Sequence, residues 1–273
     1  MKVIDFHTHI FPDRIAADAL AKLAEHSGEY RPIVDGTLGG LTESMDKAGI
    51  SLSVVSNIAT KPAQAYPIYD FCCEIQNDRI YPLVSIHPLN TLTEAEDILD
   101  KGEQRQIRGI KLHPMYQNFY IDDEKMFTFY ELFGNRNFFV VFHTGFDIAF
   151  PDNRQADVER VRRVADKFRD LSIVVTHTGG WRQWDRIGVL TGCENIYSEI
   201  SMTQPEVDDN SFIKLISLFD ENRIFFGTDS PWTDQKEMVQ KILKLKISDS
   251  LKEKILFRNA SAFMELFSYR TAT

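Results

Sequence analysis

The chain has 273 residues, of which 43% are hydrophobic and 26% are charged, as is usual for a folded globular protein. Its formal net charge of −9 argues against a general nucleic-acid-binding surface, which would need a basic stripe. No apolar run reaches the roughly 20 residues of a membrane helix, no secretory signal is visible, and Cys72, Cys73 and Cys193 form no CxxC pair. We therefore expect a cytoplasmic protein that acts on a small-molecule substrate and binds neither nucleic acid nor a membrane.

Apolar runs and amphipathic segments alternate along the whole sequence, and they predict strands and helices in turn. In chain order, the predicted strands cover residues 3–9, 52–58, 80–87, 109–113, 140–142, 172–176, 195–200 and 224–228. The predicted helices cover residues 13–26, 41–48, 63–76, 91–104, 122–133, 155–168, 212–219, 236–245 and 250–267, with a short helix after Gly180.

This alternation favours a parallel sheet with right-handed crossovers, and about eight such units close into a (β/α)8 TIM barrel. No Pro/Gly-rich linker interrupts the chain, so we expect a single barrel domain over residues 1–273 with C-terminal helices. The alternative is an open, doubly wound sheet, but its usual glycine-rich phosphate turn is missing after His9. The C-terminal helices carry enough apolar residues to cover the barrel or a second copy in a homo-oligomer.

Histidines gather at the ends of the predicted strands. His7 and His9 lie two residues apart, so their side chains point to the same face of the first strand. Later strands also close on potential ligands, namely His87, His113, His143, His177 and Asp229. In a barrel the C-terminal strand ends meet at one mouth, where active sites form. A histidine pair at a strand end can also be satisfied by local hydrogen bonds, so the metal hypothesis depends on the whole set.

Five short motifs, in this order, resemble the amidohydrolase superfamily. More narrowly, they resemble the amidohydrolase-2 branch, which includes aminocarboxymuconate-semialdehyde decarboxylase and its relatives. The matching segments are residues 4–9 (IDFHTH), 109–114 (GIKLHP), 142–145 (FHTG), 176–180 (THTGG) and 226–232 (FGTDSPW). Each motif is weak alone, but together they span nearly the whole chain. The resemblance implies a metal-dependent enzyme, and both hydrolases and nonoxidative decarboxylases occur on this scaffold.

The resemblance implies one divalent ion held by His7, His9, His143 and Asp229. Zinc is the expected metal, with manganese or another ion as the alternative. Three or four protein ligands with one open position is the catalytic pattern of zinc, and water in that position becomes acidic enough to give hydroxide at neutral pH. Asp229 would be the general base for that water. A second role for Asp229, compatible with the first, is to cap the helix that follows Pro231.

His177 and Lys111 each have two interpretations. In mononuclear relatives the strand-six histidine stays off the metal and orients or protonates the water and the substrate oxygen. In binuclear members it binds a second metal, which a carboxylated lysine on strand four bridges to the first. We favour one metal, which makes Lys111 a cation for a substrate carboxylate or carbonyl oxygen. Its structural alternative is a lysine paired inside the barrel with Glu199 or another acidic residue.

We expect a metal-dependent hydrolase that acts on an amide, ester or lactone bond of a small carboxylate-bearing substrate through a metal-bound hydroxide. Its catalytic residues would be Asp229, His177 and Lys111. The alternative is a metal-dependent nonoxidative decarboxylase of an unsaturated or aromatic acid, in which Lys111, His113 or Arg154 would hold the carboxylate. A non-catalytic metal-binding barrel is a third hypothesis, and it is disfavoured because every expected ligand position is filled.

Overall fold

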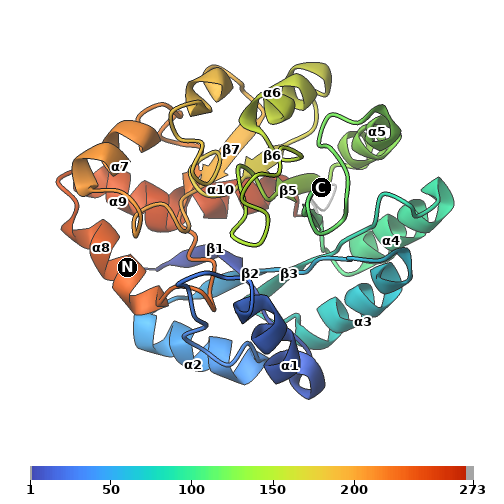
Figure 1. Cartoon of the computed structure of the whole chain (residues 1–273), viewed down its shortest axis with the longest axis horizontal. Coiled ribbons are helices and arrows are strands. Elements are labelled where there is room, and N and C mark those ends of the chain that lie inside the picture. Colours follow the sequence, from blue (N-terminus) through green and yellow to red (C-terminus); the bar gives the residue numbers. More distant parts are fainter. Residues whose placement is uncertain (1, 269–273) are drawn as a thin grey trace, which may run out of the picture.

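The computed structural model describes residues 2–268, which form a (β/α)8 TIM barrel: a ring of parallel strands surrounded by helices (Figure 1). The strands are β1 (Ile4–Thr8), β2 (Leu52–Ser56), β3 (Ile80–Leu83), β4 (Gly109–Leu112), β5 (Phe139–Phe142), β6 (Ile173–Val175), β7 (Ile196–Glu199) and β8 (Ile224–Phe225). Neighbouring strands pair in sequence order, β1 to β3 in one sheet and β4 to β8 in the other. The predicted fold class is confirmed.

Backbone hydrogen bonds join the two sheets at both seams. At the first seam, Lys111 N of β4 donates to Val84 O, directly after β3, at 2.8 Å. At the second, Phe6 N of β1 donates to Phe226 O, directly after β8, also at 2.8 Å. These bonds close the ring and bring the C-terminal ends of β1 and β8 side by side, although more than 200 residues separate them in sequence.

Helices cover the outside of the ring because their apolar residues recur at helical spacing. In α6, for example, Val158, Val161 and Val164 are buried and charged residues lie between them. The α-helices are α1 (Asp13–Ala24), α2 (Leu38–Ala48), α3 (Ala65–Ile75), α4 (Leu92–Gln104), α5 (Phe127–Asn135), α6 (Val158–Lys167), α7 (Asp209–Ile216), α8 (Gln235–Lys244), α9 (Asp249–Glu253) and α10 (Asn259–Leu266). Among residues 2–268, no helix combines the length and the apolar character needed to cross a membrane.

The element boundaries differ from the predicted ones mainly where short turns flank regular structure. The predicted third strand, 80–87, ends at Leu83, because Ser85 uses its side chain to bond Lys111 O at 2.8 Å and to accept from Ala59 N at 3.0 Å. The single predicted helix over 250–267 consists of α9, a π turn η4 (Lys254–Arg258) and α10. The short helix expected after Gly180 is the 3₁₀ turn η3 (Ile187–Leu190).

Aromatic side chains close the N-terminal end of the barrel. Phe6 and Phe225 lie inside the ring with their ring centroids 4.7 Å apart. Phe263 of α10 packs against them from below, 5.8 Å and 5.1 Å away, and 5.0 Å from Phe139. Because these rings fill the N-terminal end of the barrel interior, the polar strand-end residues lie at the opposite, C-terminal end, where barrel active sites form.

Candidate metal centre and active site

The two histidines at the end of β1 have their ring protons fixed by different partners. His7 Nδ1–H donates to Glu199 Oε1 at 2.9 Å, and His9 Nδ1–H donates to the backbone oxygen of Ser56 at 2.7 Å. We assign the ring proton to Nδ1 in both histidines because both partners are acceptors, and this tautomer leaves each Nε2 bare. The two Nε2 atoms lie 3.1 Å apart. Burial, followed by the positive charge of Lys111, lowers the pKa of His7 well below its usual value, which keeps this ring neutral.

Asp229 completes this cluster from the end of β8. Its backbone N–H donates to His7 O at 2.7 Å and its φ of 61° lies in the left-handed region, so the chain turns the side chain toward β1. The Asp229 Oδ1 atom lies 3.0 Å from His9 Nε2 and 3.5 Å from His7 Nε2. Burial alone would raise the pKa of Asp229, but the neighbouring imidazoles hold it well below the usual range. The predicted cap role is wrong, because Asp234 caps α8 by accepting from Glu237 N.

A divalent cation fits this donor set. Two bare imidazole nitrogens 3.1 Å apart cannot bond to each other, because neither carries a proton. Asp229 Oδ1 is buried beside them and accepts no hydrogen bond from any of residues 2–268. Zinc binds such nitrogens and oxygens at about 2.0–2.2 Å, which leaves ligand atoms roughly 3 Å apart. The lone pairs therefore converge as they do around one metal ion.

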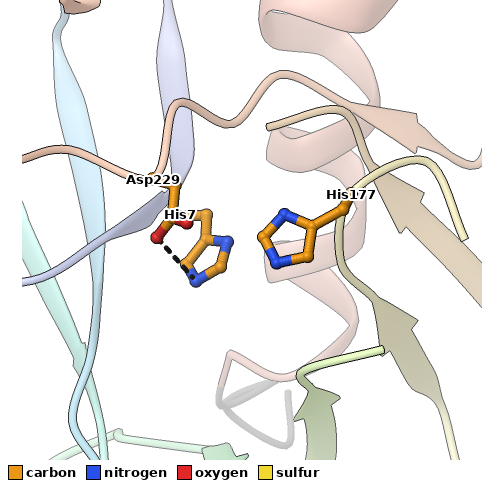
Figure 2. A group of neighbouring side chains, drawn as sticks. All are labelled: His7, His177 and Asp229. Carbon is orange, nitrogen blue, oxygen red and sulfur yellow. Dashed lines mark ion pairs between the residues drawn. The ribbon is translucent and has the colours of Figure 1, made fainter. Parts of the chain in front are cut away.

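His143 and His177 form the opposite side of the centre. His143 Nε2–H donates to Phe146 O at 2.9 Å, which leaves its Nδ1 bare and 3.3 Å from His177 Nε2. His177, His7 and Asp229 each offer a ligand atom within 4.8 Å of the others (Figure 2). His143 thus reaches the β1 histidines by way of His177, and within the described chain it makes no direct hydrogen bond or ion pair with His7, His9 or Asp229.

His177 is held in an unusual backbone conformation. Its φ is 59°, and its carbonyl accepts a 2.9 Å hydrogen bond from Trp184 Nε1. A left-handed conformation is costly for a residue with a Cβ and persists where the surroundings support it. Burial lowers the pKa of His177 to about 4, so the ring is neutral at pH 7. Its Nδ1 lies 2.8 Å from Ser201 Oγ, which directs Nε2 toward the site.

Lys111 enters the centre from β4. The residue is 1% exposed, and its Nζ lies 3.2 Å from His7 Nε2. Its predicted structural alternative, an ion pair with Glu199, is not formed, and no other carboxylate of residues 2–268 lies within ion-pairing distance of Nζ. Burial lowers the pKa of Lys111 to about 8, against the charges of Asp229 and Glu199. The barrel therefore holds a buried amine without an anionic partner beside the cluster.

Three polar residues near the centre were not among the predicted site residues. Glu199 and Ser201, at the end of β7, contact both His7 and His177. Glu199 was detectable as the only charged residue within the predicted strand over 195–200. Asp147, in the loop after β5, lies 3.3 Å from His113 Nε2 and 3.7 Å from His143 Nε2. No sequence periodicity reports such a loop contact.

Comparisons with known proteins agree with this fold. Residues 4–266 match the amidohydrolase-2 family, described as Amidohydrolase. An uncharacterised TIM-barrel protein from Bordetella bronchiseptica is 23% identical, with a TM-score of 0.80 over 98% of this chain and 99% of the other. No curated protein matches the chain.

Two further solved structures are similar in fold. A dihydroxybenzoic acid decarboxylase from Polaromonas sp. JS666, with bound manganese and the inhibitor 2-nitroresorcinol, is 16% identical, with a TM-score of 0.70 over 99% of each chain. A probable 2-pyrone-4,6-dicarboxylic acid hydrolase from Acinetobacter baumannii, with citric acid bound, is 15% identical, with a TM-score of 0.67 over 98% of this chain and 99% of that one. With a family match that covers nearly all of its residues and the strand-end motifs in family order, the chain belongs to the amidohydrolase-2 family of metal-dependent enzymes.

Proposed function

We propose that this protein is a metal-dependent hydrolase of an amide, ester or lactone bond in a small carboxylate-bearing substrate. The observation that carries the proposal is the cluster of His7 Nε2, His9 Nε2 and Asp229 Oδ1, three lone-pair donors within 3.5 Å of one another at the mouth of a closed barrel. The family includes both hydrolases and decarboxylases, so the bond that is broken is part of the proposal.

In this proposal, His7, His9, His143 and Asp229 hold one divalent ion. Zinc suits three imidazoles and one carboxylate, and manganese is the alternative because a similar structure contains it. When bound, the ion would polarise the substrate carbonyl and acidify an attacking water. A second ion would require His177 as a ligand and a carboxylated Lys111.

The chain's own residues would then transfer the proton, orient the water and bind the substrate. Asp229 is ionised, and with the His9 proton on Nδ1 its Oδ1 accepts no hydrogen bond from any of residues 2–268, so it can take the proton from the attacking water and pass it to the leaving atom. His177 is neutral and directs Nε2 into the site, so it can orient that water. Lys111 can pair with a substrate carboxylate, because a buried ammonium without a counter-ion is costly.

The decarboxylase is the second candidate, and Lys111 is the observation that favours it. A buried cation 3.2 Å from His7 Nε2 could hold the carboxylate of an unsaturated or aromatic acid next to the metal position. Several of the similar structures are decarboxylases of hydroxylated benzoic acids. Loss of CO₂ would then replace attack by water.

Labelled water separates the two reactions. Protein loaded with Zn²⁺ or Mn²⁺ is incubated with lactones, amides and unsaturated or aromatic acids in ¹⁸O-labelled water. We expect the label in the new carboxylate of a cleaved product. Release of CO₂ without such label would refute the hydrolase proposal and support the decarboxylase. The Asp229→Asn variant is the control for reaction outside the site.

The proposal also includes the cellular location and the oligomeric state of the protein. We propose a cytoplasmic location, supported by three cysteines that are all free. Homo-oligomer formation stays a prediction, tested by light scattering of the purified protein.

A further inference from the structure

One buried carboxylate contacts both histidines that face each other across the centre. Glu199 Oε1 accepts from His7 Nδ1 at 2.9 Å, from the Ser201 hydroxyl at 2.8 Å and from the backbone N–H of His177 at 3.0 Å. Its Oε2 accepts from Ser201 N at 2.7 Å. The side chain is fully buried, and a Cβ at Gly227 would lie 2.2 Å from Oε2, so only glycine there allows the carboxylate this position.

Ser201 connects Glu199 to the ring of His177 through two hydrogen bonds. A hydroxyl has one proton to donate, and Ser201 gives it to Glu199 Oε1. Its oxygen is then free to accept from His177 Nδ1–H at 2.8 Å, and also weakly from His7 Nδ1–H at 3.2 Å. Every donor in this network meets an acceptor when both rings carry their proton on Nδ1.

We propose that Glu199 and Ser201 are the positioning pair that sets the tautomers of His7 and His177, so that both rings present a bare Nε2 to the metal centre. Glu199 acts on His7 directly and on His177 through the Ser201 hydroxyl. Neither residue touches the reacting atoms. This inference rests on the proposed metal site for its functional meaning, but the tautomers themselves are properties of the chain.

The two members of the pair act on different properties. Replacing Glu199 removes the acceptor that holds His7, a metal ligand, and losing such a partner typically weakens metal binding about 10–100-fold. Replacing Ser201 leaves the bond between Glu199 and His7 intact and removes the acceptor of His177 alone. The Ser201 variant should therefore keep its metal while His177 loses its preference for the Nδ1–H tautomer.

The experiment uses the full chain with ¹⁵N-labelled histidine, because ring-nitrogen shifts distinguish a protonated nitrogen from a bare one. The His177 signals are those lost in His177→Asn. Ser198→Ala is the matched control: Ser198 is a buried serine of β7, three residues before Ser201, and its hydroxyl has no hydrogen-bond partner within residues 2–268. Zn²⁺ binding is measured by competition with a chelator for wild type, Ser201→Ala, Ser198→Ala and Glu199→Gln.

We expect His177 to carry its proton on Nδ1 in wild type and Ser198→Ala, and to become a tautomer mixture in Ser201→Ala with Zn²⁺ affinity unchanged. Glu199→Gln should weaken Zn²⁺ binding 10–100-fold. A wild-type His177 protonated on Nε2, an unchanged tautomer in Ser201→Ala, or full Zn²⁺ affinity in Glu199→Gln would overturn the inference. Failure of wild type to bind Zn²⁺ or Mn²⁺ would instead overturn the proposed metal site, while the spectra of the metal-free protein still decide the tautomers.

Discussion

Removing His9 should abolish the stabilisation that a divalent metal gives to the folded protein. His9 Nε2 lies 3.1 Å from His7 Nε2 and 3.0 Å from Asp229 Oδ1, so His9→Ala removes the donor that contacts both other members of the cluster. The side chain is only partly buried, with 18% of its surface exposed, so the truncation leaves a cavity that water can enter. The fold of the metal-free variant should therefore survive.

The size of the metal-induced rise in Tm follows from mass action. A ligand that binds only the folded state at 100 times its Kd stabilises that state by about 2.7 kcal/mol. For a chain of this size, 1 kcal/mol shifts Tm by about 2–4 °C, so metal should raise the Tm of wild type by about 5–10 °C. In His9→Ala the same metal concentration should raise it by less than about 2 °C, because losing one of four ligands raises Kd above the concentration used.

The assay is a thermal melt followed by circular dichroism, after removal of metal with a chelator and again after adding Zn²⁺ or Mn²⁺. His26→Ala is the control, because His26 is an exposed histidine in the segment after α1 and is not one of the proposed ligands. An equal metal-induced shift in wild type and His9→Ala would refute the reasoning from the cluster geometry. So would the absence of any shift in wild type with either ion.

Three further outcomes follow from the same structure. His177→Asn should keep about one metal per chain while lowering turnover by about 10²–10⁴, the usual worth of an acid–base group, whereas loss of metal would support the binuclear arrangement. Lys111→Ala should raise KM for carboxylate substrates with metal content unchanged, and a fall in metal content measured by elemental analysis would identify Lys111 as a bridging ligand. Burial raises the pKa of Glu206, but Arg182 and Tyr30 outweigh it and hold the pKa below its usual range. The stability from Glu206 is therefore present above about pH 4.5 and lost as the pH falls further, so urea melts of Glu206→Gln should depend less on pH between about 3 and 5 than those of wild type.

The sequence was sufficient to predict the barrel because each strand contains a short apolar run and each helix has apolar residues at helical spacing. It also predicted that His7, His9 and Asp229 converge, because strand ends in a barrel meet wherever the chain closes the ring. These inferences need only the order of elements and the alternation of side chains along a strand. The contacts between these three residues follow directly from the bonds between β1 and the segment after β8.

The remaining features of the site depend on contacts that no local pattern encodes. The bare nitrogen of His143 is Nδ1 rather than Nε2 only because the carbonyl of Phe146 accepts from Nε2. Ser201 reaches two imidazoles because the chain turns just after β7, a turn without a distinctive motif. The predicted strand through His87 ended early because the Ser85 hydroxyl, rather than the backbone, bonds the neighbouring strand. Hydrogen bonds of individual side chains and a local turn decided these points, and neither is encoded by the periodicity of apolar residues.

The seal at the bottom of the barrel has a consequence for how the protein is made. The aromatic rings of Phe6, Phe139 and Phe225 are covered by Phe263 of α10, which is synthesised after all eight strands. A growing chain that has not yet reached residue 259 cannot cover those rings, and β1 must wait for the segment after β8 before the ring can close. Such long-range closure is slow and leaves apolar surface exposed to other chains. Completion of the barrel therefore depends on α10, and truncation before α10 should leave these rings exposed and make the protein aggregate.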